Sequence, residues 1–253
     1  MHSLIDGILA ASRARGFAAA APWPKAERRD LIASACALKS RGIIPIIAEI
    51  KPKAVGRALA PEEVAAHARA YSENNACAIS VLTEPTHFKG ALQNALIARR
   101  SGLPVLRKDF IFEERQLSEV QADLVLLIAA LGIDLNRFVE AARALGMEPL
   151  VEVHAEKELE AALKTDARII GINNRNLNTL EVDLGTFERL APRALDAGVF
   201  LVAESGVHTR DDALRMMQAG ADALLVGTAL MGEPKGLGEM NQITMQLLHG
   251  PCL

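Results

Sequence analysis

Short, almost continuous apolar runs recur along this chain from residue 46 onward. Each run holds five or six residues rich in Val, Ile and Leu, which predicts a short buried strand. The eight runs cover residues 46–50, 77–82, 104–108, 124–128, 149–153, 168–173, 199–204 and 223–227. Because nearly unbroken apolar strands are typical of parallel sheets, we expect helices to cover this sheet.

Longer stretches with helical periodicity separate the predicted strands. The clearest cover residues 61–75, 135–146, 155–165 and 209–220. The first begins with Pro61 and acidic residues, and two of the four end on glycine, as helices commonly do. Eight strand–helix units in about 200 residues predict an α/β protein, a single (β/α)8 TIM barrel. A doubly wound open sheet is the alternative, but "KPKAVGRAL" after the first strand is not a G-x-G-x-x-G turn.

The first 45 residues precede this repeating pattern. Leu4, Ile5, Ile8 and Leu9 fall at helical spacing and predict a short amphipathic helix. We expect residues 1–45 to form an N-terminal helical extension over one end of the barrel, and residues 46–253 to form the barrel itself. The two parts are expected to make one domain.

Composition narrows the class of protein. A net charge of −3 and 4% aromatic residues do not favour binding to nucleic acid or to an anionic membrane. The longest apolar run is about half a membrane span. Cys36, Cys77 and Cys252 lie far apart, which predicts no disulfide framework and favours the cytoplasm. The histidines are scattered, so we predict no metal site. Separately, we expect the protein to be a monomer or a weak homo-oligomer.

Charged residues interrupt the apolar pattern where the strands end. Glu49 and Lys51 are two residues apart, so both are expected to face the barrel interior at its carboxyl-terminal mouth. Other polar groups at strand ends are Lys108, Glu152, Asn173, Arg175, Glu204, Ser205, Gly206, Gly227 and Thr228. Barrel enzymes carry their active sites at this mouth. Because burying unpaired charge is costly, lysines and glutamates converging there predict a catalytic or ligand-binding site.

The loops after the seventh and eighth strands suggest the kind of ligand. "ESGVHTRDD" and "VGTALMG" place small residues where backbone N–H groups can meet an anion. These two loops form the usual phosphate site of a (β/α)8 barrel. A small phosphorylated molecule is therefore the expected substrate.

The sequence resembles the indole-3-glycerol phosphate synthase family from about residue 43 to 232. The segments that carry the resemblance include "IIAEIKPK", "LPVLRKDFI", "LVEVH", "IGINNRNL", "VAESGV" and "ADALLVGTALM". The resemblance implies a carboxy-lyase of tryptophan biosynthesis that needs no metal or organic cofactor. Its substrate would be 1-(2-carboxyphenylamino)-1-deoxyribulose 5-phosphate, closed to an indole with loss of carbon dioxide and water.

The same resemblance implies roles for individual residues. Lys108 matches the general acid of ring closure, and Lys51 matches the lysine that holds the substrate carboxylate. Glu152 matches the proton-transfer carboxylate of dehydration, and Glu49 matches the glutamate that positions the lysines. The further matches are Asn173, Arg175, Glu204 and Ser205 for the substrate, Phe110 for its aromatic ring, and Gly206, Gly227 and Thr228 for its phosphate.

One segment departs from the family. Where the family usually has Ser-Pro-Ser after the first lysine, this chain has Ala54-Val55-Gly56, so a hydroxyl donor is missing. Lys53 or backbone N–H groups are expected to replace it. Two other functions stay open: a Schiff-base aldolase with Lys108 or Lys51 as nucleophile, and a barrel that binds a phosphorylated ligand without turnover.

Overall fold

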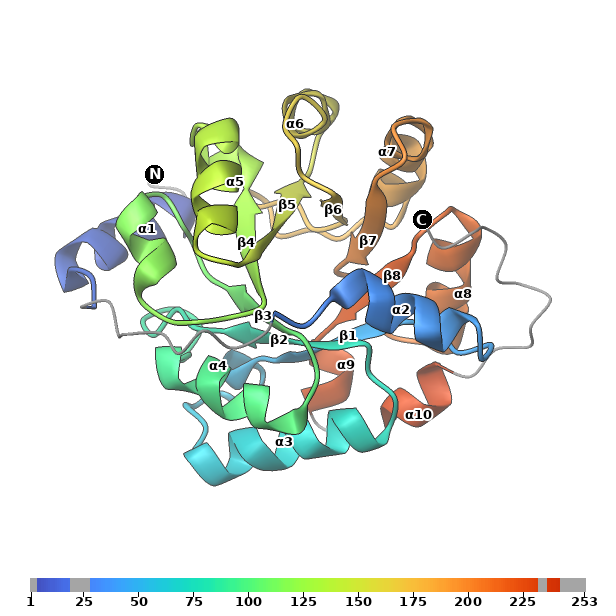
Figure 1. Cartoon of the computed structure of the whole chain (residues 1–253), viewed down its shortest axis with the longest axis horizontal. Coiled ribbons are helices and arrows are strands. Elements are labelled where there is room, and N and C mark those ends of the chain that lie inside the picture. The colour runs from blue at the N-terminus through green and yellow to red at the C-terminus, as the bar shows by residue number, and fades with distance from the viewer. Residues whose placement is uncertain (1–3, 19–27, 232–235, 242–253) are drawn as a thin grey trace.

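Eight parallel strands close into a barrel in the computed structural model, which describes residues 4–18, 28–231 and 236–241 (Figure 1). Neighbours in sequence are neighbours in the barrel, and β1 closes it by pairing with β8. The strands are β1 (Ile46–Ile50), β2 (Ala78–Leu82), β3 (Val105–Lys108), β4 (Leu124–Ile128), β5 (Glu148–Val153), β6 (Ile169–Asn173), β7 (Phe200–Glu204) and β8 (Ala223–Val226). The predicted fold is therefore confirmed, with each strand end within one residue of its predicted position.

Helices surround the barrel between successive strands and after the last one. They are α3 (Pro61–Glu73), α4 (Leu92–Ala98), α5 (Leu135–Ala144), α6 (Glu156–Ala162), α7 (Gly185–Asp196), α8 (Arg210–Gln218), α9 (Thr228–Met231) and α10 (Gly236–Met240). The four predicted helical stretches correspond to α3, α5, α6 and α8. Between β3 and β4 the chain makes a short 3₁₀ turn, η3 (Glu114–Ser118), in place of an α-helix.

Strand side chains alternate between two apolar layers. Ala48 and Ile50 pack outward against the helices, whereas Ile47 belongs to the cluster inside the barrel. Glu49 has the parity of Ile47 and therefore points inward, as expected from the sequence. Because of this alternation, a polar side chain near a strand end points either into the barrel or outward toward the helices.

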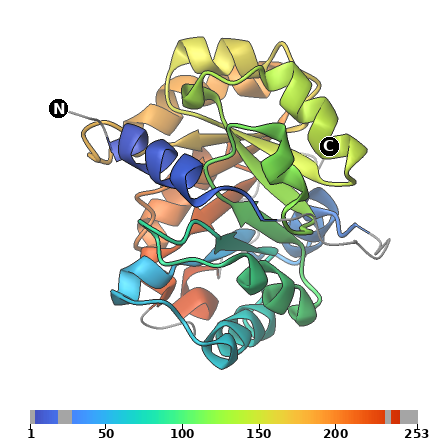
Figure 2. The same ribbon diagram turned by 90° about the vertical axis from the view of Figure 1, so that its left-hand side faces the viewer.

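The N-terminal extension is divided between two places on the barrel, not packed on one end. Helix α2 (Leu31–Lys39) lies beside the strand beginnings, where Ser34 Oγ donates a 2.7 Å hydrogen bond to the Cys77 carbonyl. Helix α1 (Leu4–Arg15) lies by the loops that follow β2 and β3, with the Arg13 guanidinium 5.0 Å from the Phe112 ring centre. Figure 1 shows the two helices on opposite sides, and Figure 2 shows α1 crossing the side that carries it. Each helix buries apolar residues where it lies: Ile8 in α1, and Leu31, Ala35 and Leu38 in α2.

Two further sequence expectations can be compared with the structure. In the described ranges, every helix is too short or too polar to cross a membrane. Cys77 is a buried free thiol, whereas Cys36 is disulfide-bonded, a bond that the wide cysteine spacing did not predict. Cys252 lies outside the described residues.

Candidate active site

Buried side chains of alternating charge converge at the carboxyl ends of β1, β3 and β7. Lys108 Nζ lies 3.2 Å from Glu49 Oε2 and 3.3 Å from Glu204 Oε2. Lys51 Nζ lies 4.0 Å from the other oxygen of Glu49. Glu49 and Glu204 are 3% and 0% exposed, so their carboxyl groups contact these lysines rather than bulk water.

Glu152 extends the cluster from β5. Its side chain is buried, and its Oε1 lies 3.2 Å from His154 Nε2. The second ring nitrogen of His154 lies 3.1 Å from Glu158 Oε2. Charges thus alternate from the cavity toward the outside of the barrel along Glu152, His154 and Glu158.

The two lysines have opposite electrostatic environments. Burial acts to lower the pKa of Lys108, but Glu49, Glu204 and Glu152 outweigh it and raise that pKa above its ordinary value. Burial lowers the pKa of Lys51, and Glu49 offsets this effect only in part. The carboxylates therefore hold Lys108 in its charged form, whereas burial favours the neutral form of Lys51.

The two buried carboxyls beside Lys108 also differ. Burial raises the pKa of Glu204, and the neighbouring charge of Glu152 adds to the effect. Burial acts to raise the pKa of Glu152 as well, but His154 and Lys108 outweigh it and lower that pKa. Burial therefore favours the protonated form of Glu204, whereas His154 and Lys108 favour the ionised form of Glu152.

A cavity of about 100 Å³ opens beside this cluster, and we call it the apolar lobe. Its charged wall carries Glu49, Lys51, Lys108 and Glu152, together with Arg175. Its apolar wall is made by Leu82, Phe88, Phe110, Leu126, Ile128 and Leu177. The Phe88 and Phe110 rings lie 5.9 Å apart, which leaves an aromatic wall for a flat apolar group.

A second, smaller cavity of about 50 Å³ continues from the first, and we call it the glycine lobe. It is lined by Gly206 and Val207 after β7, and by Gly227 and Thr228 after β8. Lys51, Lys108 and Arg175 line both lobes. Backbone N–H groups of small residues next to three cations suit an anion.

Two local features shape the glycine lobe. Ser205 has a φ of 65°, a left-handed conformation that is uncommon for a residue with a side chain and is typical of functional sites. A Cβ on Gly227 would lie 2.5 Å from Glu49 Oε1, so only glycine leaves room for the buried carboxylate there.

The structure brings together most of the residues predicted from the sequence. Those that line a lobe are Glu49, Lys51, Lys108, Phe110, Glu152, Asn173, Arg175, Ser205, Gly206, Gly227 and Thr228. Glu204 lies behind Lys108 and contacts it directly. Lys53 is exposed and lines neither lobe; its Nζ lies 4.9 Å from the Phe88 ring centre.

Sequence reasoning missed the apolar wall and His154. Leu126 and Ile128 share one face of β4, so the alternation of that strand was a usable signal. Phe88 lies in a loop whose path the sequence does not give. His154 follows Glu152 by two residues, but its contact with Glu158 depends on where α6 begins.

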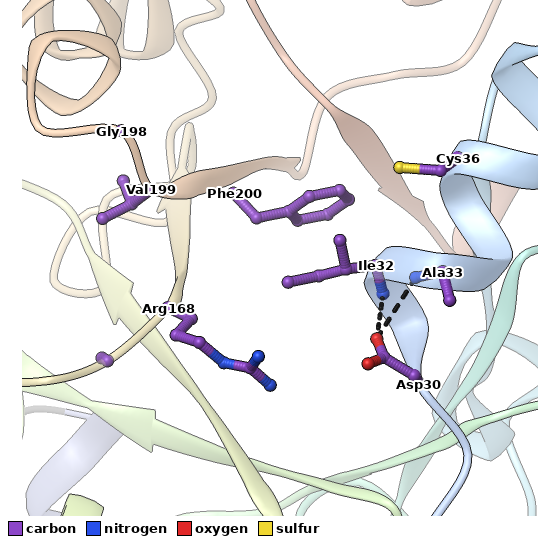
Figure 3. Close-up of a pocket in the computed structure, with 9 residues that line it drawn as sticks. Asp30, Ile32, Ala33, Cys36, Arg168, Gly198, Val199 and Phe200 are labelled. Carbon is purple, nitrogen blue, oxygen red and sulfur yellow. Dashed lines mark hydrogen bonds between the residues drawn. The ribbon is translucent and has the colours of Figure 1, made fainter. Parts of the chain in front are cut away.

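A larger pocket of about 570 Å³ lies elsewhere, between α2 and the chain segments that lead into β6 and β7 (Figure 3). Asp30 and Arg168 are its charged residues, and Ile32, Val199 and Phe200 form much of its apolar wall. Asp30 is already engaged as the N-cap of α2, accepting hydrogen bonds from the Ile32 and Ala33 backbone. This pocket has none of the paired lysines and glutamates of the apolar lobe.

Fold and site together define a (β/α)8 barrel with an acid–base cluster where enzymes of this architecture carry out their chemistry. A sequence model of the indole-3-glycerol phosphate synthase family matches residues 17–242. The chain belongs to this family.

Individual relatives agree with that assignment. The chain is 48% identical to "Indole-3-glycerol phosphate synthase" of Halobacterium salinarum over 92% of this chain and 93% of the relative. It is 43% identical to the protein of that name from Parafrankia sp., over 93% and 92%. A solved structure titled "Thiamine phosphate pyrophosphorylase from Pyrococcus furiosus" shares the fold, with a TM-score of 0.59 at 18% identity over 78% of this chain and 93% of that one.

Proposed function

We propose that this chain is an indole-3-glycerol phosphate synthase, a decarboxylating lyase of tryptophan biosynthesis. It converts 1-(2-carboxyphenylamino)-1-deoxyribulose 5-phosphate to indole-3-glycerol phosphate, carbon dioxide and water. The observation that carries the proposal is the paired lobes with lysines at their junction. The substrate carries an aromatic ring, a reacting ketone and a phosphate in that order, and the apolar lobe, the lysines and the glycine lobe match them in the same order.

The lobes suggest how the substrate is held. The carboxyphenyl ring lies in the apolar lobe against Phe88 and Phe110, and the phosphate lies in the glycine lobe. The ketone then falls between them, beside Lys108 and Lys51. Holding both ends of a flexible substrate brings its ring carbon close to its ketone, which removes much of the entropic cost of ring closure.

Ring closure needs positive charge at the ketone oxygen. The ring carbon that bears the carboxylate attacks the ketone carbon, and negative charge develops on the ketone oxygen. Lys108, held charged by Glu49 and Glu204, donates a hydrogen bond and then a proton to that oxygen. Lys51 pairs with the carboxylate until the bond to the ring breaks and carbon dioxide leaves, and it shares the acid role.

Dehydration needs a base. The new hydroxyl takes a proton and leaves as water, and the five-membered ring loses a proton to become an indole. Glu152 is ionised and lines the apolar lobe, so it accepts that proton. Asn173, whose Oδ1 accepts the Arg175 backbone N–H at 3.0 Å, and Arg175 hold the sixth loop against the substrate.

A fluorescence assay tests the proposal. Mixing the protein with the anilino-deoxyribulose phosphate should produce indole fluorescence, with one carbon dioxide released per indole formed. A folded sample that gives neither signal would refute the activity.

We further propose that the protein acts in the cytoplasm as a monomer or weak homo-oligomer on this small substrate, without nucleic acid or membrane as partners.

One observation favours a second candidate. Burial lowers the pKa of Lys51, and a lysine of that kind is what a Schiff-base aldolase requires. Borohydride reduction in the presence of substrate separates the two, because ring closure by acid–base catalysis passes through no imine. A reduced adduct at Lys51 would support the aldolase, and an unmodified chain supports the synthase.

A further inference from the structure

His154 lies outside the cavity but contacts a residue of its charged wall. It follows β5 directly, and its side chain is 10% exposed. Nε2 lies 3.2 Å from Glu152 Oε1, and Nδ1 lies 3.1 Å from Glu158 Oε2. A neutral imidazole has one N–H and one lone pair, so it would turn a lone pair toward one of these carboxylates. Only the doubly protonated imidazolium is attracted to both.

The start of α6 fixes the ring in this position. Glu158 lies in the first turn of α6 and accepts a 2.7 Å hydrogen bond from the His154 backbone N–H as well as contacting the ring. An acidic residue in the first turn of a helix commonly reaches back in this way to a free N–H. Backbone and ring of His154 are therefore held by one carboxylate.

The other charged side chains near His154 form ion pairs with partners of their own. On the outer side, Arg193 of α7 pairs with Glu156 at 3.1 Å, and Arg189 pairs with Asp183 at 3.0 Å. On the inner side, Glu152 faces Lys108 and Glu204. The carboxylates that face the ring are Glu152 and Glu158.

We propose that His154 is a positioning residue for Glu152. Its imidazolium, anchored by Glu158, keeps the Glu152 carboxylate ionised and in place at the cavity wall. This inference rests on the proposed function, in which Glu152 is the base of dehydration. Lys108 contacts Glu49 and Glu204 directly, whereas the cation in direct contact with Glu152 is His154. Burial opposes the charged form of His154, yet the two glutamates raise its pKa to about 10.

Three variants test the inference through the pH profile of turnover. In His154→Ala, Glu152 loses its nearest cation, so its pKa rises and the acidic limb of kcat moves up by about one pH unit or more. His154→Gln keeps an N–H donor without charge and should show the same shift. Glu158→Gln should show a smaller shift in the same direction. KM should stay within about threefold, because His154 lines neither lobe of the cavity.

The matched control is His67→Gln on α3, which should leave the pH profile unchanged. An acidic limb that stays in place in both His154 variants would overturn the inference. His154→Gln carries the test if His154→Ala does not fold.

A second measurement does not depend on turnover. In an ¹⁵N NMR titration of the histidine rings, the His154 ring should stay doubly protonated at pH 8, and Glu152→Gln should lower its pKa. A His154 ring that loses its proton below pH 7 would contradict the inference even if the enzyme is active. If the wild-type protein forms no indole while His154 titrates as expected, the proposed function is refuted, but the ion pair between His154 and Glu152 is supported.

Discussion

At the scale of single residues, Lys108 is the centre of the charge cluster. It is the one cation within hydrogen-bonding distance of both Glu49 and Glu204 in the described part of the chain. These contacts keep the ammonium charged and fix its position at the junction of the two lobes. A fixed cation at the place where negative charge develops is worth several kcal/mol of activation free energy.

Replacing Lys108 should therefore stop the reaction. We expect Lys108→Ala to lower kcat by at least about a thousandfold, with the far-UV circular dichroism unchanged, because the two glutamates can take up protons when the lysine is lost. Steady-state indole formation measures the loss. Lys164→Ala, an exposed lysine after α6, is the matched control. Near wild-type turnover in Lys108→Ala would show that another group is the acid.

Gly171 gives a second test at this scale, because it makes room for Glu204. A Cβ at this position would lie 2.1 Å from Glu204 Oε1 and 2.8 Å from Leu150 Cδ2. We expect Gly171→Ala to displace the carboxyl from Lys108 and lower kcat about tenfold or more. Gly236→Ala, where the new methyl group meets nothing within 4 Å, is the control. Equal kcat values in the two variants would show that the contact between Glu204 and Lys108 does not matter for turnover.

At the scale of elements, the first loop of the barrel folds into a short turn that does not reach the glycine lobe. The chain after β1 forms a 3₁₀ turn, η1 (Pro52–Val55), which is capped by Gly56. Ala54 and Val55 are exposed, and neither lines the glycine lobe. Loops seven and eight line that lobe, so they are the expected phosphate contacts.

A pair of substitutions tests this division. Ala54→Ser restores a hydroxyl in η1 and should change KM less than about twofold. Thr228→Val removes a hydroxyl from the glycine lobe and should raise KM by roughly fivefold to tenfold, the effect of one lost hydrogen bond. KM for the substrate and inhibition by inorganic phosphate are the measurements. A large decrease of KM in Ala54→Ser would place the phosphate against the first loop.

The strands were predictable from the sequence, and some helices were not. A continuous apolar run such as residues 124–128 fits a strand that is buried on both faces of a helix-covered sheet. The first and last residues of the strand can therefore be read from the sequence. Helix α7 contains Pro192, and α4 has only seven residues, so both give weak signals. Arg107 in β3 is fully buried because Glu119 and Asp109 pair with it, which requires knowing the path of the following loop.

At the scale of the whole molecule, the barrel separates stability from chemistry. A second charge cluster lies at the beginning of β5, at the opposite end from the active site. There Glu148 pairs with Arg28 at 2.6 Å, Arg168 at 2.7 Å and Arg143 at 3.2 Å. These contacts link the segment before α2 to α5, β5 and the residue before β6.

The Glu148 cluster should make stability depend on pH. Burial acts to raise the pKa of Glu148, but the three arginines outweigh it and lower that pKa below the ordinary 4.5. A carboxyl with a lowered pKa stabilises the fold above 4.5, and the contribution is lost as pH falls through the folded value. We expect Glu148→Gln to lower the free energy of unfolding by roughly 1–3 kcal/mol at pH 7, and by progressively less as the pH falls below the ordinary pKa of 4.5.

Urea unfolding at pH 7 and at pH 3 measures this difference, with kcat expected to stay near wild type. Glu140→Gln, an exposed residue of α5, is the control. A stability loss that is as large at pH 3 as at pH 7 would mean that packing, rather than charge, accounts for the effect.

Much of the candidate site was also predictable at this scale. Strand parity and the rule that barrel sites lie at carboxyl ends place Glu49, Lys51, Lys108 and Glu152 together. The two-lobed shape of the cavity was not predictable from the sequence. Part of the wall of the apolar lobe is Phe88, which reaches it from a loop whose path the sequence does not give. The sequence also did not reveal the position of α1 beside the loops after β2 and β3.

A crystal structure with indole-3-glycerol phosphate bound tests the central claim most directly. We predict the indole in the apolar lobe beside Phe110, the phosphate within about 3 Å of the backbone N–H groups around Gly206 and Gly227, and Lys108 Nζ beside the carbon chain that joins them. Product bound in the pocket beneath α2, or with its phosphate held by η1 alone, would contradict the account.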